Sequence, residues 1–166
     1  MRVPEAEYDR VQSIVGAFYA VYNYYGYGLL ESVYCGALEH ELTDRGHRVA
    51  REVSFDVTYK GRHVARQRVD MLVDDWVIVE VKATEHLPPY AKRQLVNYLR
   101  ATSANIGVLF HFGPEAYFWR ATEGPKSDAR PSTLDPKERT LPSAGSASSA
   151  TGDAGRSPAR DAHRAT

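Results

Sequence analysis

The sequence predicts an α/β (α+β) fold with a mixed central sheet flanked by helices. In three segments, apolar residues recur every three or four positions, as in amphipathic helices. In other segments they alternate with polar residues or form short apolar runs, as in strands. The predicted order along the chain is helix, helix, three strands, helix, strand and a short fifth strand.

Residues able to form a core end near position 122 of the 166-residue chain. All 11 tyrosines, 5 phenylalanines and 2 tryptophans precede Glu123, and only Leu134 and Leu141 are large aliphatic residues after it. A segment of this composition cannot bury enough surface to fold. We therefore predict one domain over residues 5–122 and a disordered tail rich in Ser, Ala, Pro and Gly over residues 123–166.

Composition narrows the function classes. The 21 basic and 21 acidic residues give a formal net charge of zero, so nucleic-acid binding would need a local basic cluster. The single cysteine, Cys35, excludes an internal disulfide and a zinc site built from cysteines. The N-terminus is polar, and no run approaches 18 apolar residues. We expect a cytoplasmic protein without a membrane span.

Two helices are predicted first. The first covers residues 6–24 and ends at the glycine-containing stretch 23–28, and the second runs from Leu29 to a cap at Gly46. Glu31 lies in the first turn of the second helix. It is simply a favourable charge near a helix N-terminus, worth about 0.3–1 kcal/mol, or it is a third acidic ligand beside those described below.

A strand pair is predicted next, over residues 49–59 and 62–73, joined by a turn at residues 60–61. Apolar residues alternate along residues 49–59, which predicts that one face of this strand is buried. The polar face of the second strand carries Arg66 and Arg68. These arginines either contact a phosphate or are ordinary surface residues.

Residues 68–82, RVDMLVDDWVIVEVK, predict two strands joined by a three-residue loop. This register pairs apolar residues on one face: Val73 with Val77, Met71 with Val79, and Val69 with Val81. On the other face it sets Asp70 opposite Glu80, with Lys82 two residues beyond.

Facing carboxylates repel each other, so the pair is costly unless a cation lies between them. Oxygen ligands in an incomplete shell suit Mg²⁺ or Mn²⁺, which also bind substrate phosphates. Lys82 could orient or deprotonate a water molecule, or hold a phosphate. The pattern indicates metal-assisted phosphodiester hydrolysis. The alternative is a solvated hairpin face that happens to carry these charges.

A helix is predicted over residues 90–103, followed by strands over 105–112 and 116–120. Gln94 and Tyr98 are four residues apart and share a face of that helix. Lys92 and Arg93 flank Gln94 as substrate contacts or as its solvated side. The five histidines between positions 40 and 111 show no ligand spacing, and no Ser–His–Asp arrangement stands out.

This pattern resembles the PD-(D/E)XK nuclease superfamily, and more closely the family named after its GxxExxY motif. Gly28, Glu31 and Tyr34 supply that motif in GLLESVY. YKG, RVD, VIVEVKA, NYLRAT and a terminal Phe-Gly also match in order, over about residues 8–115. The tail matches nothing, and GYGLLE lacks the family's usual proline between the glycines.

The resemblance implies a restriction-endonuclease-like core and assigns roles to particular residues. Asp70 and Glu80 match the metal-binding acids, and Lys82 matches the catalytic lysine. Glu31 matches a further acid from the first core helix, and the Val81 carbonyl would be an extra ligand. Gln94 and Tyr98 fit the QxxxY pattern that shapes the site, and Tyr34 either orients Glu31 or packs.

We therefore expect a nuclease that requires Mg²⁺ or Mn²⁺ and acts on nucleic acid, DNA being favoured over RNA. The alternative is a catalytically silent module of the same fold that binds nucleic acid or a protein partner, with the tyrosines of residues 22–27 exposed for stacking. A homodimer or a partner protein is compatible with either function.

Overall fold

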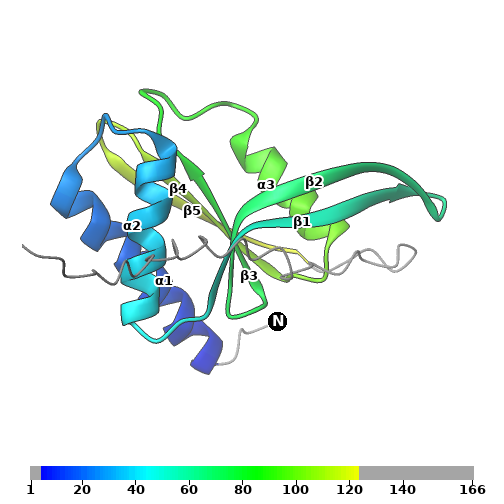
Figure 1. Cartoon of the computed structure of the whole chain (residues 1–166), viewed down its shortest axis with the longest axis horizontal. Helices are drawn as coiled ribbons and strands as arrows, with labels where there is room; N and C mark the ends of the chain where they lie inside the picture. The colour runs from blue at the N-terminus through cyan, green and yellow to red at the C-terminus, as the bar shows by residue number, and fades with distance from the viewer. Residues whose placement is uncertain (1–4, 124–166) are drawn as a thin grey trace, which may run out of the picture.

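The structure, a computed structural model, describes residues 5–123 (Figure 1). Except for Glu123, the predicted tail lies outside the described residues. The elements are α1 (Glu5–Tyr25), α2 (Glu31–Asp44), β1 (Val49–Tyr59), β2 (Arg62–Val73), β3 (Val77–Lys82), α3 (Ala91–Ala101), β4 (Ile106–Phe112) and β5 (Ala116–Thr122). This order confirms the predicted one. Within the described residues, no helix is long and apolar enough to cross a membrane.

The five strands form one mixed sheet in the order β1-β2-β3-β4-β5. β1, β2 and β3 are antiparallel neighbours, and β4 runs parallel to β3 after the crossover through α3. β5 returns antiparallel to β4. A mixed sheet flanked by helices was the predicted fold class, and the structure confirms it.

The two faces of the sheet have separate hydrophobic cores. α1 and α2 pack on one face, where Phe18 stacks on Phe110 with ring centroids 4.6 Å apart. α3 packs on the other face through residues such as Leu95 and Leu99. β4 is buried along its whole length, and β3 is buried up to its last residue. Burial on both faces explains why these strands appear in the sequence as apolar runs rather than as alternating patterns.

The predicted turns are confirmed. Asp74 and Asp75 both have positive φ, 52° and 68°, and the Trp76 N–H donates to the Val73 carbonyl at 3.2 Å. Aspartate tolerates this left-handed conformation better than most residues, which suits it to this hairpin loop. Val73 pairs with Val77 across the loop, as the sequence predicted.

The predicted strand faces are partly wrong. Met71 and Val73 face α1 and α2, whereas Val69 faces α3 together with Val53 and Phe55. The change of face occurs where Glu52 of β1 has a φ of 53° and does not pair with Asp70 in the ladder. Such a distortion re-aims side chains. Beyond it, the β1–β2 hairpin extends away from the body of the domain (Figure 1).

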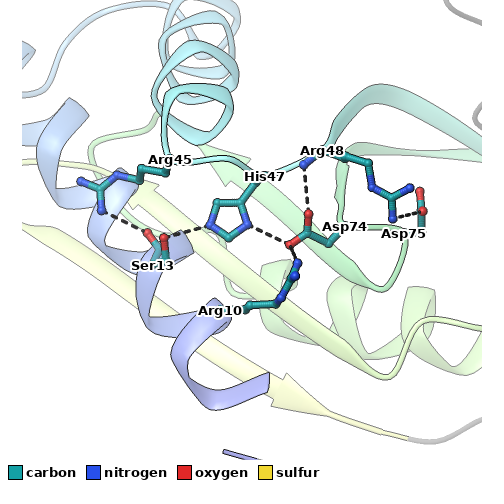
Figure 2. Close-up of polar contacts among 7 residues, drawn as sticks. All are labelled: Arg10, Ser13, Arg45, His47, Arg48, Asp74 and Asp75. Carbon is teal, nitrogen blue, oxygen red and sulfur yellow. Dashed lines mark hydrogen bonds and ion pairs between the residues drawn. The ribbon is translucent and has the colours of Figure 1, made fainter. Parts of the chain in front are cut away.

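The hairpin loop between β2 and β3 is tied to the helices by the buried carboxylate of Asp74 (Figure 2). Its Oδ2 accepts from Arg10 Nη1 at 2.7 Å and from His47 Nδ1 at 2.8 Å, and its Oδ1 accepts from the Arg48 N–H at 2.9 Å. Burial alone would raise the pKa of Asp74, but these hydrogen bonds outweigh it and lower the pKa.

The same cluster contains a Ser–His–Asp chain that the sequence did not indicate. The Ser13 hydroxyl lies 2.9 Å from His47 Nε2, and the three residues come from α1, the α2–β1 connection and the β2–β3 loop (Figure 2). Three arginines surround it, and Arg10 shares the carboxylate oxygen that binds His47. We interpret these three hydrogen-bonded residues as a structural link between α1 and the β2–β3 loop.

We predict that Asp74→Asn lowers the free energy of unfolding by about 2–4 kcal/mol. The substitution leaves His47 buried and Arg10 without a charged partner. Asparagine also tolerates positive φ, so backbone strain does not contribute. Urea unfolding at neutral pH measures the effect. Asp75→Asn is the matched control, because its ion pair with Arg48 is exposed and is worth less than about 1 kcal/mol. Equal losses in the two variants would contradict this account.

Candidate active site

The predicted site residues converge at the C-terminal end of β3. Lys82 Nζ donates to Glu80 Oε1 at 2.7 Å, and Asp70 Oδ2 accepts from the Val81 N–H at 2.7 Å. Glu31, at the start of α2, accepts a backbone hydrogen bond from Ala83. The charges of Asp70, Glu80 and Lys82 all act on one another and on Glu31, so the four groups share one electrostatic environment.

Two pairs of the predicted register are wrong. The β2–β3 ladder ends at Met71 and Val79, so neither Asp70 with Glu80 nor Val69 with Val81 is a ladder pair. The distortion at Glu52 and Asp70 ends the regular pairing. The Asp70 carboxylate takes over by accepting the Val81 N–H, which would otherwise continue the ladder.

The three carboxylates hold their protons more tightly than isolated ones. Burial raises the pKa of Glu80 to about 7, and the Asp70 charge raises it further, although the hydrogen bond from Lys82 opposes both. Burial also raises the pKa of Asp70, although the hydrogen bond from the Val81 N–H opposes the rise. Burial raises the pKa of Glu31 as well, although the charge of Lys82 opposes it. Burial is the largest cause in all three, so a bound cation would favour their ionised forms.

Lys82 is charged at neutral pH. Burial alone would lower its pKa, but the hydrogen bond and ion pair with Glu80, together with the charges of Glu31 and Asp70, raise it. The side chain is 14% exposed, so its ammonium reaches the surface of the site. It is therefore positioned as a hydrogen-bond donor rather than as a base.

The residues fit a divalent cation. Glu80 Oε2 is buried and accepts no hydrogen bond from residues 5–123. An unpartnered buried carboxylate oxygen is costly and implies a missing partner. No three His, Cys, Asp or Glu side chains in the described range form a preformed metal-ligand group. Mg²⁺ needs only one or two carboxylates, because waters and substrate phosphates complete its shell.

Arg51 belongs to the site and was missed in the sequence. Its charge lowers the pKa of Asp70, and it forms an ion pair with Glu39 of α2 at 3.5 Å. Its Nε is buried without a hydrogen-bond partner in the described chain. The signal in the sequence is an arginine among the apolar positions of residues 49–59.

Gln94 and Tyr98 lie beside the acidic groups. Gln94 Nε2 donates to the Tyr98 hydroxyl at 2.6 Å, and Gln94 Oε1 is buried with no partner among the described residues. Burial raises the pKa of Tyr98, and the negative charges of Glu80 and Asp70 raise it further. The predicted shared face of these two residues therefore borders the site.

The GxxExxY residues have distinct structural roles. Gly28 has a φ of 103°, which favours glycine. Tyr34 is fully buried and stacks on Phe112 with centroids 4.0 Å apart. Its hydroxyl donates to the Gly26 carbonyl at 2.9 Å and accepts from the Leu29 N–H at 3.2 Å. Tyr34 therefore packs and also fixes the loop that leads into Glu31.

The four predicted basic contacts lie in different settings. Arg66 and Arg68 are exposed on β2, and Arg68 lies 3.7 Å from Glu52. Lys92 lies over the rings of Tyr117 and Trp119, at 5.2 and 5.5 Å from their centroids. Arg93 is exposed on α3 near Gln94. Contact of these four residues with substrate stays a prediction.

Comparison with known proteins supports a family assignment. The family model described as the PD-(D/E)XK nuclease superfamily matches residues 8–120. No curated protein matches the chain. A solved structure titled "Crystal structure of SSO0001" is similar with a TM-score of 0.44 and 16% identity, over 57% of this chain and 50% of that one. The chain therefore spans about half the length of that structure, and this likeness carries no argument.

We predict that the stability of the metal-free protein depends on Glu80. Its folded-state pKa of about 7 exceeds the ordinary 4.5, so the folded state binds the proton more tightly than the unfolded state. The resulting stability is complete below pH 4.5 and is lost as pH rises through 7. Urea unfolding in EDTA should show a loss between pH 5 and pH 8 on the order of 2 kcal/mol.

Glu80→Gln should flatten this profile, and the exposed Glu85→Gln should leave it unchanged. Adding Mn²⁺ at pH 8 should raise the unfolding temperature of the parent more than that of Glu80→Gln. Parallel pH profiles for the parent and Glu80→Gln would contradict this electrostatic account.

Proposed function

The chain belongs to the PD-(D/E)XK nuclease superfamily, and on that premise we propose that it is a divalent-metal-dependent nuclease that hydrolyses phosphodiester bonds of nucleic acid, with DNA favoured over RNA. One observation carries the proposal. Three carboxylates with raised pKa values act on one another and on a charged lysine that is bound to one of them, and one buried carboxylate oxygen has no partner in the described chain. This arrangement suits a cation and a phosphate better than it suits stability alone.

Asp70 and Glu80 would hold Mg²⁺ or Mn²⁺, with Glu31 and the Val81 carbonyl as further oxygen donors. When bound, the metal ion would stabilise negative charge on the scissile phosphate and lower the pKa of water. Burial supports these roles, since hydrogen bonds and charges act more strongly where water is excluded. Arg51, through its ion pair with Glu39, helps to position Asp70.

Lys82 would act as a charged donor in this mechanism. Its raised pKa keeps the proton on Nζ, so the ammonium donates to a phosphate oxygen or orients the attacking water. The ion pair with Glu80 holds Nζ at the edge of the acidic cluster, 2.7 Å from Oε1. Gln94 and Tyr98 would shape the path of the substrate to this point, with Arg66, Arg68, Lys92 and Arg93 available for phosphates.

We also propose that the chain belongs to the GxxExxY family. The positive φ of Gly28 and the two hydrogen bonds of the Tyr34 hydroxyl support this assignment, because they explain the motif spacing physically. Gly28 allows the chain to turn into α2, and Glu31 begins that helix. One helical turn later, the Tyr34 hydroxyl binds back to the loop at Gly26 and Leu29.

A second candidate is a catalytically silent module that binds nucleic acid or a protein partner, which includes a second copy of the chain. The end of α1 and the loop after it favour this candidate, since Tyr24 is 80% exposed and Tyr27 is 58% exposed. Tyr22 does not belong to this surface, because its hydroxyl donates to the Gly113 and Pro114 carbonyls.

We predict metal-dependent cleavage of nucleic acid that is lost in Asp70→Asn and Lys82→Ala. Removing a metal ligand or the charged donor should lower kcat at least about 100-fold. The assay uses single- and double-stranded DNA and RNA with EDTA, Mg²⁺ or Mn²⁺.

Glu85→Gln is the matched control, an exposed acid outside the site. Cleavage that persists in both site variants would identify a contaminant. No cleavage by any protein, together with salt-sensitive binding that survives Asp70→Asn, would favour the silent module.

A further inference from the structure

A cavity of about 410 Å³ lies between the β1–β2 hairpin and α3, next to the candidate active site. Phe55 and Val57 of β1 and Gln67 of β2 line it from the hairpin. Tyr90, just before α3, and Asn97 line it from the opposite side. In Figure 1, α3 runs beside the hairpin where the hairpin leaves the body of the domain. The volume falls within the range of small-ligand pockets, about 300–1,000 Å³.

The lining combines apolar surface with free hydrogen-bonding groups. The apolar part includes Phe55, which is buried and packs edge-on against Tyr98 at 5.4 Å. Three carboxamides line the same cavity, from Gln67, Gln94 and Asn97. Gln94 Oε1 is buried without a partner in residues 5–123, although its Nε2 is bound to Tyr98. Carboxamides donate and accept at once, as the edge of a nucleobase does.

The cavity and the acidic centre are linked through Tyr98. Gln94 and Tyr98 line the cavity, and Tyr98 also lies close enough to Glu80 and Asp70 for their charges to act on it. A ligand in the cavity would therefore contact a side chain that the charges of the proposed metal ligands also reach, which suits a nucleotide neighbouring the reacting one.

A second hollow of about 460 Å³ adjoins the first across α3. Arg93 and Asn97 line both hollows, and the second also contains Lys92 and Arg100. Glu123 neutralises Arg100 in an ion pair. Lys92 and Arg93 leave the hollow basic, which suits a phosphate backbone approaching the cavity.

We propose that the cavity between the β1–β2 hairpin and α3 is a subsite for one unpaired nucleobase, and that the substrate is therefore single-stranded or has an unpaired end. This inference rests on the nuclease function proposed above. A paired base has its Watson–Crick edge occupied and is stacked on both sides. Only an unpaired base can enter the cavity and meet its amides.

Tyr90 is the group that stacks on the base. Its side chain lines the cavity while the residue is 62% exposed, so the ring stands at the rim and is available to a ligand. Asn97 is exposed as well, so both can be changed without disturbing the core. Phe55 and Tyr98 are buried and are left intact in the test.

The test is binding of fluorescent oligonucleotides to the full chain in EDTA, where no metal-dependent cleavage occurs. A single strand should bind at least about 10-fold more tightly than the duplex of the same sequence. Tyr90→Ala combined with Asn97→Ala should weaken single-strand binding about 10-fold or more, as expected from lost stacking, and leave duplex binding unchanged. DNA and RNA strands are both tested.

The matched control combines Tyr8→Ala with Asn105→Ala, which removes an exposed tyrosine and an exposed asparagine away from the cavity. It should bind like the parent. Equal affinity for single strand and duplex, or equal weakening by the test and control pairs, would overturn the subsite.

A parallel cleavage assay in Mn²⁺ separates this inference from the nuclease proposal. Selective single-strand binding without cleavage would support the subsite and contradict the nuclease. Cleavage without any difference between single strand and duplex would support the nuclease and contradict the subsite.

Discussion

The site depends on one electrostatic constraint, which is that three partly buried carboxylates share one lysine. Glu80 lies two residues before the end of β3, where the strand is buried on both faces, so its carboxylate cannot turn to water, and its Oε2 finds no partner in the described chain. Asp70 and Glu31 are held close by backbone hydrogen bonds from Val81 and Ala83. The fold keeps this repulsion at a cost in stability, as functional sites commonly do.

The surrounding structure holds these charges in place. β4 pairs with β3 as far as Lys82, and on the other side the Val81 N–H donates to Asp70 of β2, so the end of β3 is held on both sides. The distortion at Glu52 frees Asp70 from the ladder and turns its carboxylate to the Val81 N–H. Asp74, in the loop between β2 and β3, is bound to Arg10 of α1. The Tyr34 hydroxyl binds the Gly26 carbonyl and so fixes the loop before Glu31. Each acid is therefore positioned by a different element.

Local chemistry made much of this predictable. The turn at Asp74, the register of Val73 with Val77 and the grouping of Asp70, Glu80 and Lys82 follow from period-two patterning. The position of Val69 did not, because a strand distortion changes its face without a glycine or proline to mark it. Ser13, His47 and Asp74 are far apart in the sequence, so only the tertiary fold brings them together. Arg51 is the charged residue in an otherwise apolar alternation over residues 49–59, but nothing in that pattern links it to Asp70.

The most direct test is a crystal of the protein soaked in Mn²⁺ and measured for anomalous scattering. The account predicts a peak between the carboxylates of Asp70 and Glu80, beside the currently unpartnered Oε2, that disappears in Glu80→Gln crystals. A peak only at another place on the protein would contradict the account. So would the absence of any peak when the same protein in solution cleaves nucleic acid in Mn²⁺.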